Sequence, residues 1–85
     1  MRIHFTKHAL EKFDILKRHG FEISKADVVR ILKNPELTDY SRSPLKIVQR
    51  SFDKDHVVRV VYKEEEETKV VITFYPGRKH QYEKK

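Results

Sequence analysis

Hydrophobic and polar positions recur with two different periods along this chain, and the change of period divides it into a helical half and a β half. After a short extended lead-in, apolar side chains recur every three or four positions, as they do on one face of a helix. This spacing predicts a first helix from a Thr6 cap to about His19, with Gly20 as its stop. A second helix is predicted from a Ser24 cap to the residue before Pro35.

From residue 37 onward the apolar positions recur with the period of two that is typical of strands. Turn residues separate the predicted strands, which cover residues 37–42, 45–52, 56–63 and 69–75. Short connections between successive strands favour an antiparallel meander. Each apolar helix face needs a partner, so we expect a single α+β domain over residues 1–85, in which two N-terminal helices pack on an antiparallel β-meander of three to four strands.

The composition adds a basic charge to this picture and excludes several kinds of site. The net charge is +6, which favours polyanion partners such as RNA, with plain solubility as the alternative. No cysteine is present, which excludes disulfides and cysteine-ligated zinc. The first residues lack the apolar stretch of a secretory signal and no later segment could span a membrane, so we expect a cytoplasmic protein. Abundant Lys and Glu beside few Asn and Gln are typical of a thermophilic source.

Candidate chemistry on the first helix centres on His8. It shares a stripe with Lys12, at the boundary between the buried and the solvated faces. An imidazole in this position can exchange protons near neutral pH, and the alternative is a boundary histidine that bonds to backbone. His4 and His8 have the spacing of metal ligands, but the helix begins between them, so we expect no metal site and no cofactor.

Candidate chemistry on the strands centres on Arg59, which four valines flank in a strand that we expect to be central. Burying a guanidinium without a partner is costly, so Arg59 either pairs with a carboxylate or faces a polar cleft. Arg50 has a similar position on the preceding strand, and Tyr75 lies on the more polar face of the last one. The tail that follows interleaves aromatic and basic side chains, and we expect it to contact nucleic acid unless it is merely solvated. The candidate nucleic-acid-binding residues are Arg50, Tyr75, Arg78, Lys79 and His80.

Several short motifs give the chain a resemblance to a known kind of domain. They are the opening Phe5-Thr6-Lys7-His8-Ala9 with Lys12, the Asn34-Pro35 exit, Val58-Arg59-Val60-Val61-Tyr62, and Ile72-Thr73-Phe74-Tyr75-Pro76. Together they resemble a small prokaryotic domain family of uncharacterised function, which in turn is similar to the BrnT and RelE-type toxins. Those toxins are ribonucleases in which helices pack on an antiparallel sheet.

The resemblance implies a RelE-like domain that cleaves RNA without a metal ion as part of a toxin–antitoxin system, with a small antitoxin protein as its partner. In that reaction the ribose 2′-hydroxyl attacks the adjacent phosphate, which requires a base, an acid and cations around the phosphate. The catalytic candidates are then His8, Lys12, Arg59 and Tyr82. The alternatives are a non-enzymatic nucleic-acid-binding module and a protein-interaction domain that pairs through an edge strand.

Overall fold

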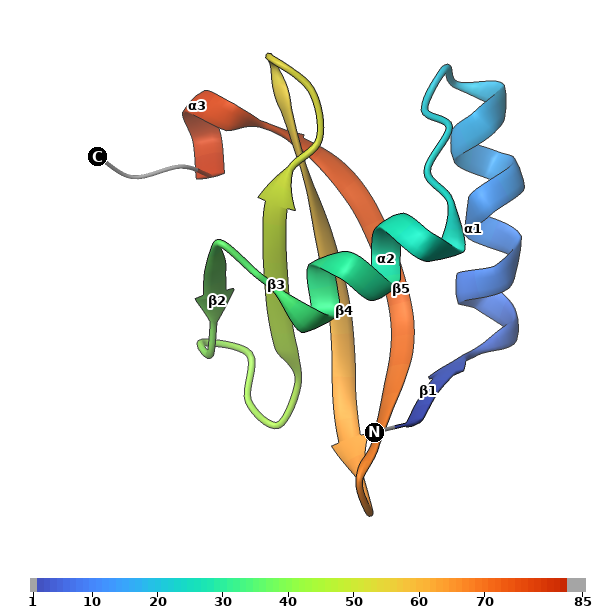
Figure 1. The fold of residues 1–85 in the computed structure, drawn as a ribbon, viewed down its shortest axis with the longest axis vertical. Coiled ribbons are helices and arrows are strands. Elements are labelled where there is room, and N and C mark those ends of the chain that lie inside the picture. The colour runs from blue at the N-terminus through green and yellow to red at the C-terminus, as the bar shows by residue number, and fades with distance from the viewer. Residues whose placement is uncertain (1, 83–85) are drawn as a thin grey trace.

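The structure, a computed structural model, describes residues 2–82 and the side chains of residues 2–81, and this part of the chain forms five strands and three helices (Figure 1). In chain order the elements are β1 (Arg2–Phe5), α1 (Lys7–Arg18), α2 (Lys25–Lys33), β2 (Leu37–Asp39), β3 (Lys46–Ser51), β4 (His56–Glu65), β5 (Thr68–Arg78) and α3 (Lys79–Tyr82). The predicted α+β class and the two N-terminal helices are therefore confirmed.

Both long helices begin at the predicted caps, because a side-chain oxygen at each start accepts a backbone N–H that would otherwise lack a partner. Thr6 Oγ1 accepts from Ala9 N at 3.1 Å. At the start of α2, Ser24 and Asp27 form a reciprocal capping box, in which each side chain accepts from the other's backbone N–H. Gly20 follows α1 with a φ of +90°, a conformation that glycine adopts without strain.

The sheet is mixed, with the strand order β1-β5-β4-β3-β2, and this corrects the prediction of an antiparallel meander of three to four strands. The meander accounts for β2 to β5, which pair antiparallel in sequence order. The lead-in at residues 2–5 is a further strand, β1, which pairs parallel with β5 in a register that sets Arg2 opposite Thr68. Parallel partners need a long connection, so no local turn signal marks this pairing.

The ends of the strands also differ from the predicted bounds. We expected the last strand to stop at Tyr75, but β5 continues through Pro76 and Gly77 to Arg78. A proline is tolerated where a strand lacks a neighbour on one side, and β1 pairs with β5 only as far as Val71. The predicted tail then turns into the short helix α3, and β2 ends at Asp39 instead of residue 42.

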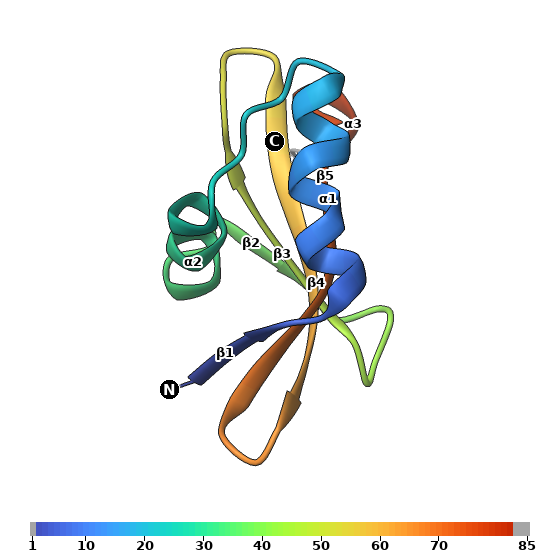
Figure 2. The same ribbon diagram turned by 90° about the vertical axis from the view of Figure 1, so that its right-hand side faces the viewer.

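The two faces of the sheet have different cover. Val58, Val60 and Phe74 have no exposed surface and belong to the core cluster that includes Ala9 of α1 and Ile31 of α2. Figure 2 shows α2 on one side of the sheet, and α3 with the loop after β2 on the other. By alternation along the strands, this second face carries the residues between the core valines of β4. We call it the open face.

A bulge joins the start of α1 to the sheet. The β4–β5 register shifts between Val61 and Tyr62, so that Ile72 of β5 is an extra residue. Its carbonyl oxygen accepts a hydrogen bond from Thr6 Oγ1 at 3.2 Å. The same threonine therefore caps α1 and fastens the helix start to the middle of β5.

Candidate nucleic-acid interface

The structure does not bring the four predicted catalytic residues together. His8 is exposed on α1, and Lys12 is half-buried one turn later. Arg59 lies between Val58 and Val60, whose side chains pack in the core on the helix side, so its own side chain is on the open face. A sheet layer therefore separates the α1 candidates from Arg59, and the predicted centre is not assembled. The side chain of Tyr82 lies outside the part of the chain that the structure describes.

Arg50 makes its contacts with the segment that leaves α2. Its guanidinium donates from Nη1 to the carbonyl oxygen of Asn34 at 3.0 Å, and lies 3.9 Å from a carboxylate oxygen of Glu36. These contacts hold the segment that leaves α2 against β3. Arg50 therefore has a structural role at this place.

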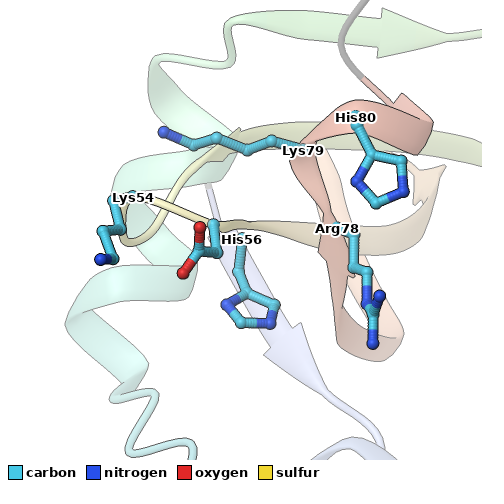
Figure 3. A pocket seen from close by; sticks show the side chains of 6 residues that line it. Lys54, His56, Arg78, Lys79 and His80 are labelled. Carbon is cyan, nitrogen blue, oxygen red and sulfur yellow. The ribbon is translucent and has the colours of Figure 1, made fainter.

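The other basic residues of the predicted tail gather in a hollow at the end of the sheet where β4 begins and β5 ends. This basic hollow has a cavity volume of about 510 Å³. Its lining residues are Lys54, Asp55, His56, Arg78, Lys79 and His80. His56 and Arg78 occupy paired positions of β4 and β5, and their side chains point the same way (Figure 3). Three predicted binding residues thus lie together with two basic residues that were not predicted.

A turn before β4 fixes the ring of His56. Asp53 Oδ1 accepts from the backbone N–H groups of Asp55 and His56, at 2.8 Å each, and lies 3.0 Å from His56 Nδ1. The hydrogen bond from Asp55 is the main cause of a lowered pKa of Asp53, and the bond to the His56 ring adds to it. A carboxylate at Nδ1 favours the tautomer with the proton on that nitrogen. Nε2 is then the ring atom that can accept a proton.

The aromatic ring of Phe21 supports the same histidine from the helix side. The two ring centroids are 5.0 Å apart, and the planes meet at 81° in an edge-to-face arrangement. His56 is therefore oriented by a carboxylate at one ring atom and by an aromatic ring at its side.

A second hollow lies on the open face, and Arg59 is at its base. We call it the Arg59 hollow, and its cavity volume is about 600 Å³. The residues of this hollow on which the argument depends are Asp39, Tyr40, Arg42, Arg59, Tyr75 and Gln81. Gln81 belongs to α3, whose first residues line the basic hollow, so this short helix contributes side chains to both.

Arg59 is buried and is held by two polar partners. Only 8% of its side chain is exposed. Nη1 donates to Gln49 Oε1 at 2.9 Å, and Nη2 donates to Asp39 Oδ2 at 3.4 Å. The two alternatives that the sequence left open are therefore both realised, because Arg59 pairs with a carboxylate and also lines a polar cavity.

The carboxylate of Asp39 is accessible from this cavity. Its Oδ1 accepts from the backbone N–H of Ser41 at 2.8 Å, and 32% of its side chain is exposed. Hydrogen bonds from Ser41 are the main cause of a lowered pKa of Asp39, and the Arg59 guanidinium adds to them. Asp39 is consequently an anion at neutral pH.

Sequence reasoning missed most of the polar residues in these hollows. Gln49 carried a signal, because it alternates with Ile47 on one face of its strand and we expected the neighbouring strand to carry Arg59. A turn was expected between the predicted strands 45–52 and 56–63, but the side-chain bond from its Asp53 to His56 was not. Asp39, Tyr40 and Arg42 lie around the end of β2, and nothing in their local pattern links them to β4.

Two kinds of feature were not found in the described part of the chain. Among the residues with described side chains, no three His, Asp or Glu are grouped as ligands of a metal ion would be. No helix within residues 2–82 is long and apolar enough to span a bilayer.

The fold and its hollows define a class of protein: a small basic α+β domain in which two helices cover one face of a mixed sheet and polar hollows lie at its end and open face. Residues 5–76 match the family described as a domain of unknown function, DUF4258, and the chain belongs to that family. No curated protein and no solved structure matched the chain. The similarity to BrnT and RelE-type toxins stays a prediction.

Proposed function

We propose that this protein binds single-stranded RNA and that the basic hollow contacts the RNA phosphates. The observation that carries the proposal is the gathering of Lys54, His56, Arg78, Lys79 and His80 around one cavity of about 510 Å³. Lysine and arginine side chains placed on phosphates release condensed counterions, which drives binding at low salt. The open face beside α3 offers Tyr40 and Tyr75, which suit the stacking of unpaired bases.

The test is binding of a fluorescent, unstructured RNA, followed by anisotropy at several salt concentrations. We expect the double variant Arg78→Ala/Lys79→Ala to weaken binding and to lower the slope of log affinity against log salt by roughly 1.4, about 0.7 for each lost phosphate contact. The matched control is Lys17→Ala/Arg18→Ala in the last turn of α1, which removes the same charges from an exposed surface.

The control variant shows whether a loss of binding comes from the basic hollow or only from the lower net charge. Equal losses in both double variants would contradict the proposal, since the position of the cations would then not matter. Failure of the unmodified protein to bind RNA at low salt would also overturn it, and would favour the alternative of a protein-interaction domain.

Cleavage of the bound RNA is a second candidate, and the His56–Asp53 pair favours it. A base that removes the 2′-hydroxyl proton must offer a free ring nitrogen, and Asp53 at Nδ1 leaves Nε2 of His56 in that state. His80, from α3, would protonate the leaving 5′-oxygen, while Arg78 and Lys79 stabilise charge on the phosphate. The hydroxyl oxygen bonds to phosphorus as the 5′-oxygen leaves, which yields a 2′,3′-cyclic phosphate and a free 5′-hydroxyl.

This candidate is tested by incubating end-labelled RNA with the protein in the presence of a metal chelator. We expect His56→Ala to slow cleavage by about 10²- to 10⁴-fold, the usual contribution of a general base. His8→Ala is the control, because His8 lies on exposed α1 in the other layer and we expect it to leave the rate unchanged. Intact RNA with the unmodified protein would limit the function to binding.

A further inference from the structure

We propose that the Arg59 hollow is a base-reading site that accepts a guanine nucleotide, with Asp39 as the group that recognises the base. This inference rests on the proposed RNA binding and gives it a sequence preference. It is carried by the position of an accessible carboxylate inside a polar cavity with aromatic side chains at its walls.

The first argument is the hydrogen-bonding capacity of Asp39. A carboxylate offers about four acceptor sites. The bonds from Ser41 N to Oδ1 and from Arg59 Nη2 to Oδ2 use two of them, and the Ser41 hydroxyl, which can rotate away, donates to a third. Asp39 lines the cavity and 32% of its side chain is exposed, so a ligand that replaces the Ser41 hydroxyl has two acceptors to contact. The ligand edge that fits two neighbouring acceptors is a pair of adjacent N–H donors.

Among the RNA bases, guanine presents this pair of donors on its Watson–Crick edge, at N1 and at the exocyclic amino group. Adenine and cytosine offer an amino group beside a ring nitrogen that is an acceptor. The lone pair of that nitrogen would be repelled by the carboxylate. Uracil offers a single ring N–H between two carbonyl oxygens. Unpaired bases in RNA are commonly read on this edge. Asp39 therefore favours guanine over the other three.

The second argument is the role of Arg59, which acts through Asp39 as a positioning residue. Its side chain is almost completely buried, and Gln49, itself 3% exposed, holds Nη1. Because Nη2 then donates to Asp39, the orientation of the carboxylate is fixed before a ligand arrives. A preorganised acceptor binds more tightly than one that must first be ordered.

The third argument concerns the walls and the charge of the cavity. Tyr40 is 66% exposed, and Tyr75 lies directly across from Arg59 on β5, so aromatic surface is available for stacking. Arg42, an exposed residue that also lines the hollow, adds a positive charge, while the charges of Arg59 and Asp39 offset one another. The hollow is therefore suited to a ligand with a planar donor edge and an anionic phosphate, which describes a guanine nucleotide.

The test is titration of ¹⁵N-labelled full-length protein with GMP, AMP, CMP and UMP, followed by amide chemical shifts. We expect GMP to bind between about 5-fold and 150-fold more tightly than the other three, the range for one bidentate base contact. The shifts should centre on residues 38–42 and on Arg59. Equal affinities for the four nucleotides, or shifts confined to the basic hollow, would overturn the proposal.

Substitutions then separate recognition from a purely structural role. Asp39→Asn should abolish the preference for GMP, because an amide replaces one acceptor with a donor. Asp14→Asn, the same change on the exposed surface of α1, should leave the preference intact. Tyr40→Ala should weaken the binding of all four nucleotides, and Tyr40→Phe should restore it. Neither change disturbs the core, since Tyr40 is exposed. Retention of the GMP preference in Asp39→Asn would overturn the proposal.

Two additional arms distinguish this inference from the proposed function. Oligouridine has no guanine, so the effect of Arg78→Ala/Lys79→Ala on its binding affinity tests the basic hollow alone. If the double variant weakens oligouridine binding but the protein does not prefer GMP, the base-reading proposal fails while the RNA-binding proposal stands. N-acetyl-arginine amide presents the same paired donors as guanine, and its binding without a response to GMP would overturn the proposal in favour of a protein partner.

Discussion

At the scale of single residues, Phe74 and Arg59 show the two ways in which this small chain uses buried side chains. Phe74 has no exposed surface and meets the ring of Phe13 at a centroid distance of 4.6 Å, so it joins β5 to α1. Arg59, from the neighbouring strand, is almost as deeply buried, but it forms hydrogen bonds to polar partners on the open face. The first arrangement stabilises the fold, and the second shapes a site.

Truncation of Phe74 should be severely destabilising. We expect Phe74→Ala to lower the free energy of unfolding by about 3–5 kcal/mol, from lost burial and from the cavity that remains. Urea unfolding followed by circular dichroism measures this change. Leu10→Ala, at a side chain that is 44% exposed on α1, should change the free energy by less than about 0.5 kcal/mol. Similar losses at both positions would contradict the assignment of Phe74 to the core.

The sequence indicated that Arg59 needed a partner, but it could not identify which carboxylate. Asp39 lies in β2, and β3 separates β2 from β4 in the sheet. The contact therefore depends on the registers of two strand pairs at once. A pattern along one strand carries no information on register, and this is why Asp39 was missed.

At the scale of elements, the helices were the most predictable part of the fold because their signals are local. Each cap bonds to a backbone N–H only three residues away, from Thr6 to Ala9 and from Ser24 to Asp27. The stop depends on the conformation of Gly20 alone. The pairing of β1 was the least predictable, since its partner in β5 lies at the other end of the chain. Both hollows are lined by residues from different strands, which strand pairing brings together. Most of the candidate site could therefore not be predicted from local sequence patterns.

The cap of α2 should make stability depend on pH. The hydrogen bond from Ser24 N is the main cause of a lowered pKa of Asp27. A group with a lowered folded-state pKa contributes stability above its unfolded-state pKa, near 3.8, and this contribution is lost as the pH falls through the folded-state pKa. We expect Asp27→Asn to cost about 1 kcal/mol at pH 7 and progressively less below about pH 4.

Urea unfolding at a series of pH values measures this dependence. Asp14→Asn serves as the control, because Asp14 is exposed on α1 and makes no capping bond in the described structure. A loss for Asp27→Asn that stays constant down to pH 3 would show that the cap does not depend on the carboxylate charge.

At the scale of the whole molecule, one core cluster includes side chains from α1, α2 and the sheet. The helices therefore have no separate core on which to remain folded once the sheet opens. The same architecture places Arg59 with Gln49 and Asp39 on the open face, so the Arg59 hollow and the core lie on opposite sides of the strands.

The whole domain should consequently unfold in one step. We expect a single calorimetric transition with a heat-capacity change of about 1.0–1.3 kcal/mol/K, from the usual 12–15 cal/mol/K for each residue. The ratio of calorimetric to van't Hoff enthalpy should be close to one. Two resolved transitions, or a ratio well above one, would show that the helical layer and the sheet unfold independently.

The bond between the Thr6 hydroxyl and the Ile72 carbonyl has a consequence for how the protein is made. These residues are 66 positions apart in the chain. At ordinary elongation rates, about 3–13 s pass on the ribosome between the addition of one and the addition of the other. Throughout that interval the first strand has been synthesised but has no strand to pair with. β1 therefore takes its native place only after residues 68–71 have been synthesised, and it needs protection from other strand edges until then.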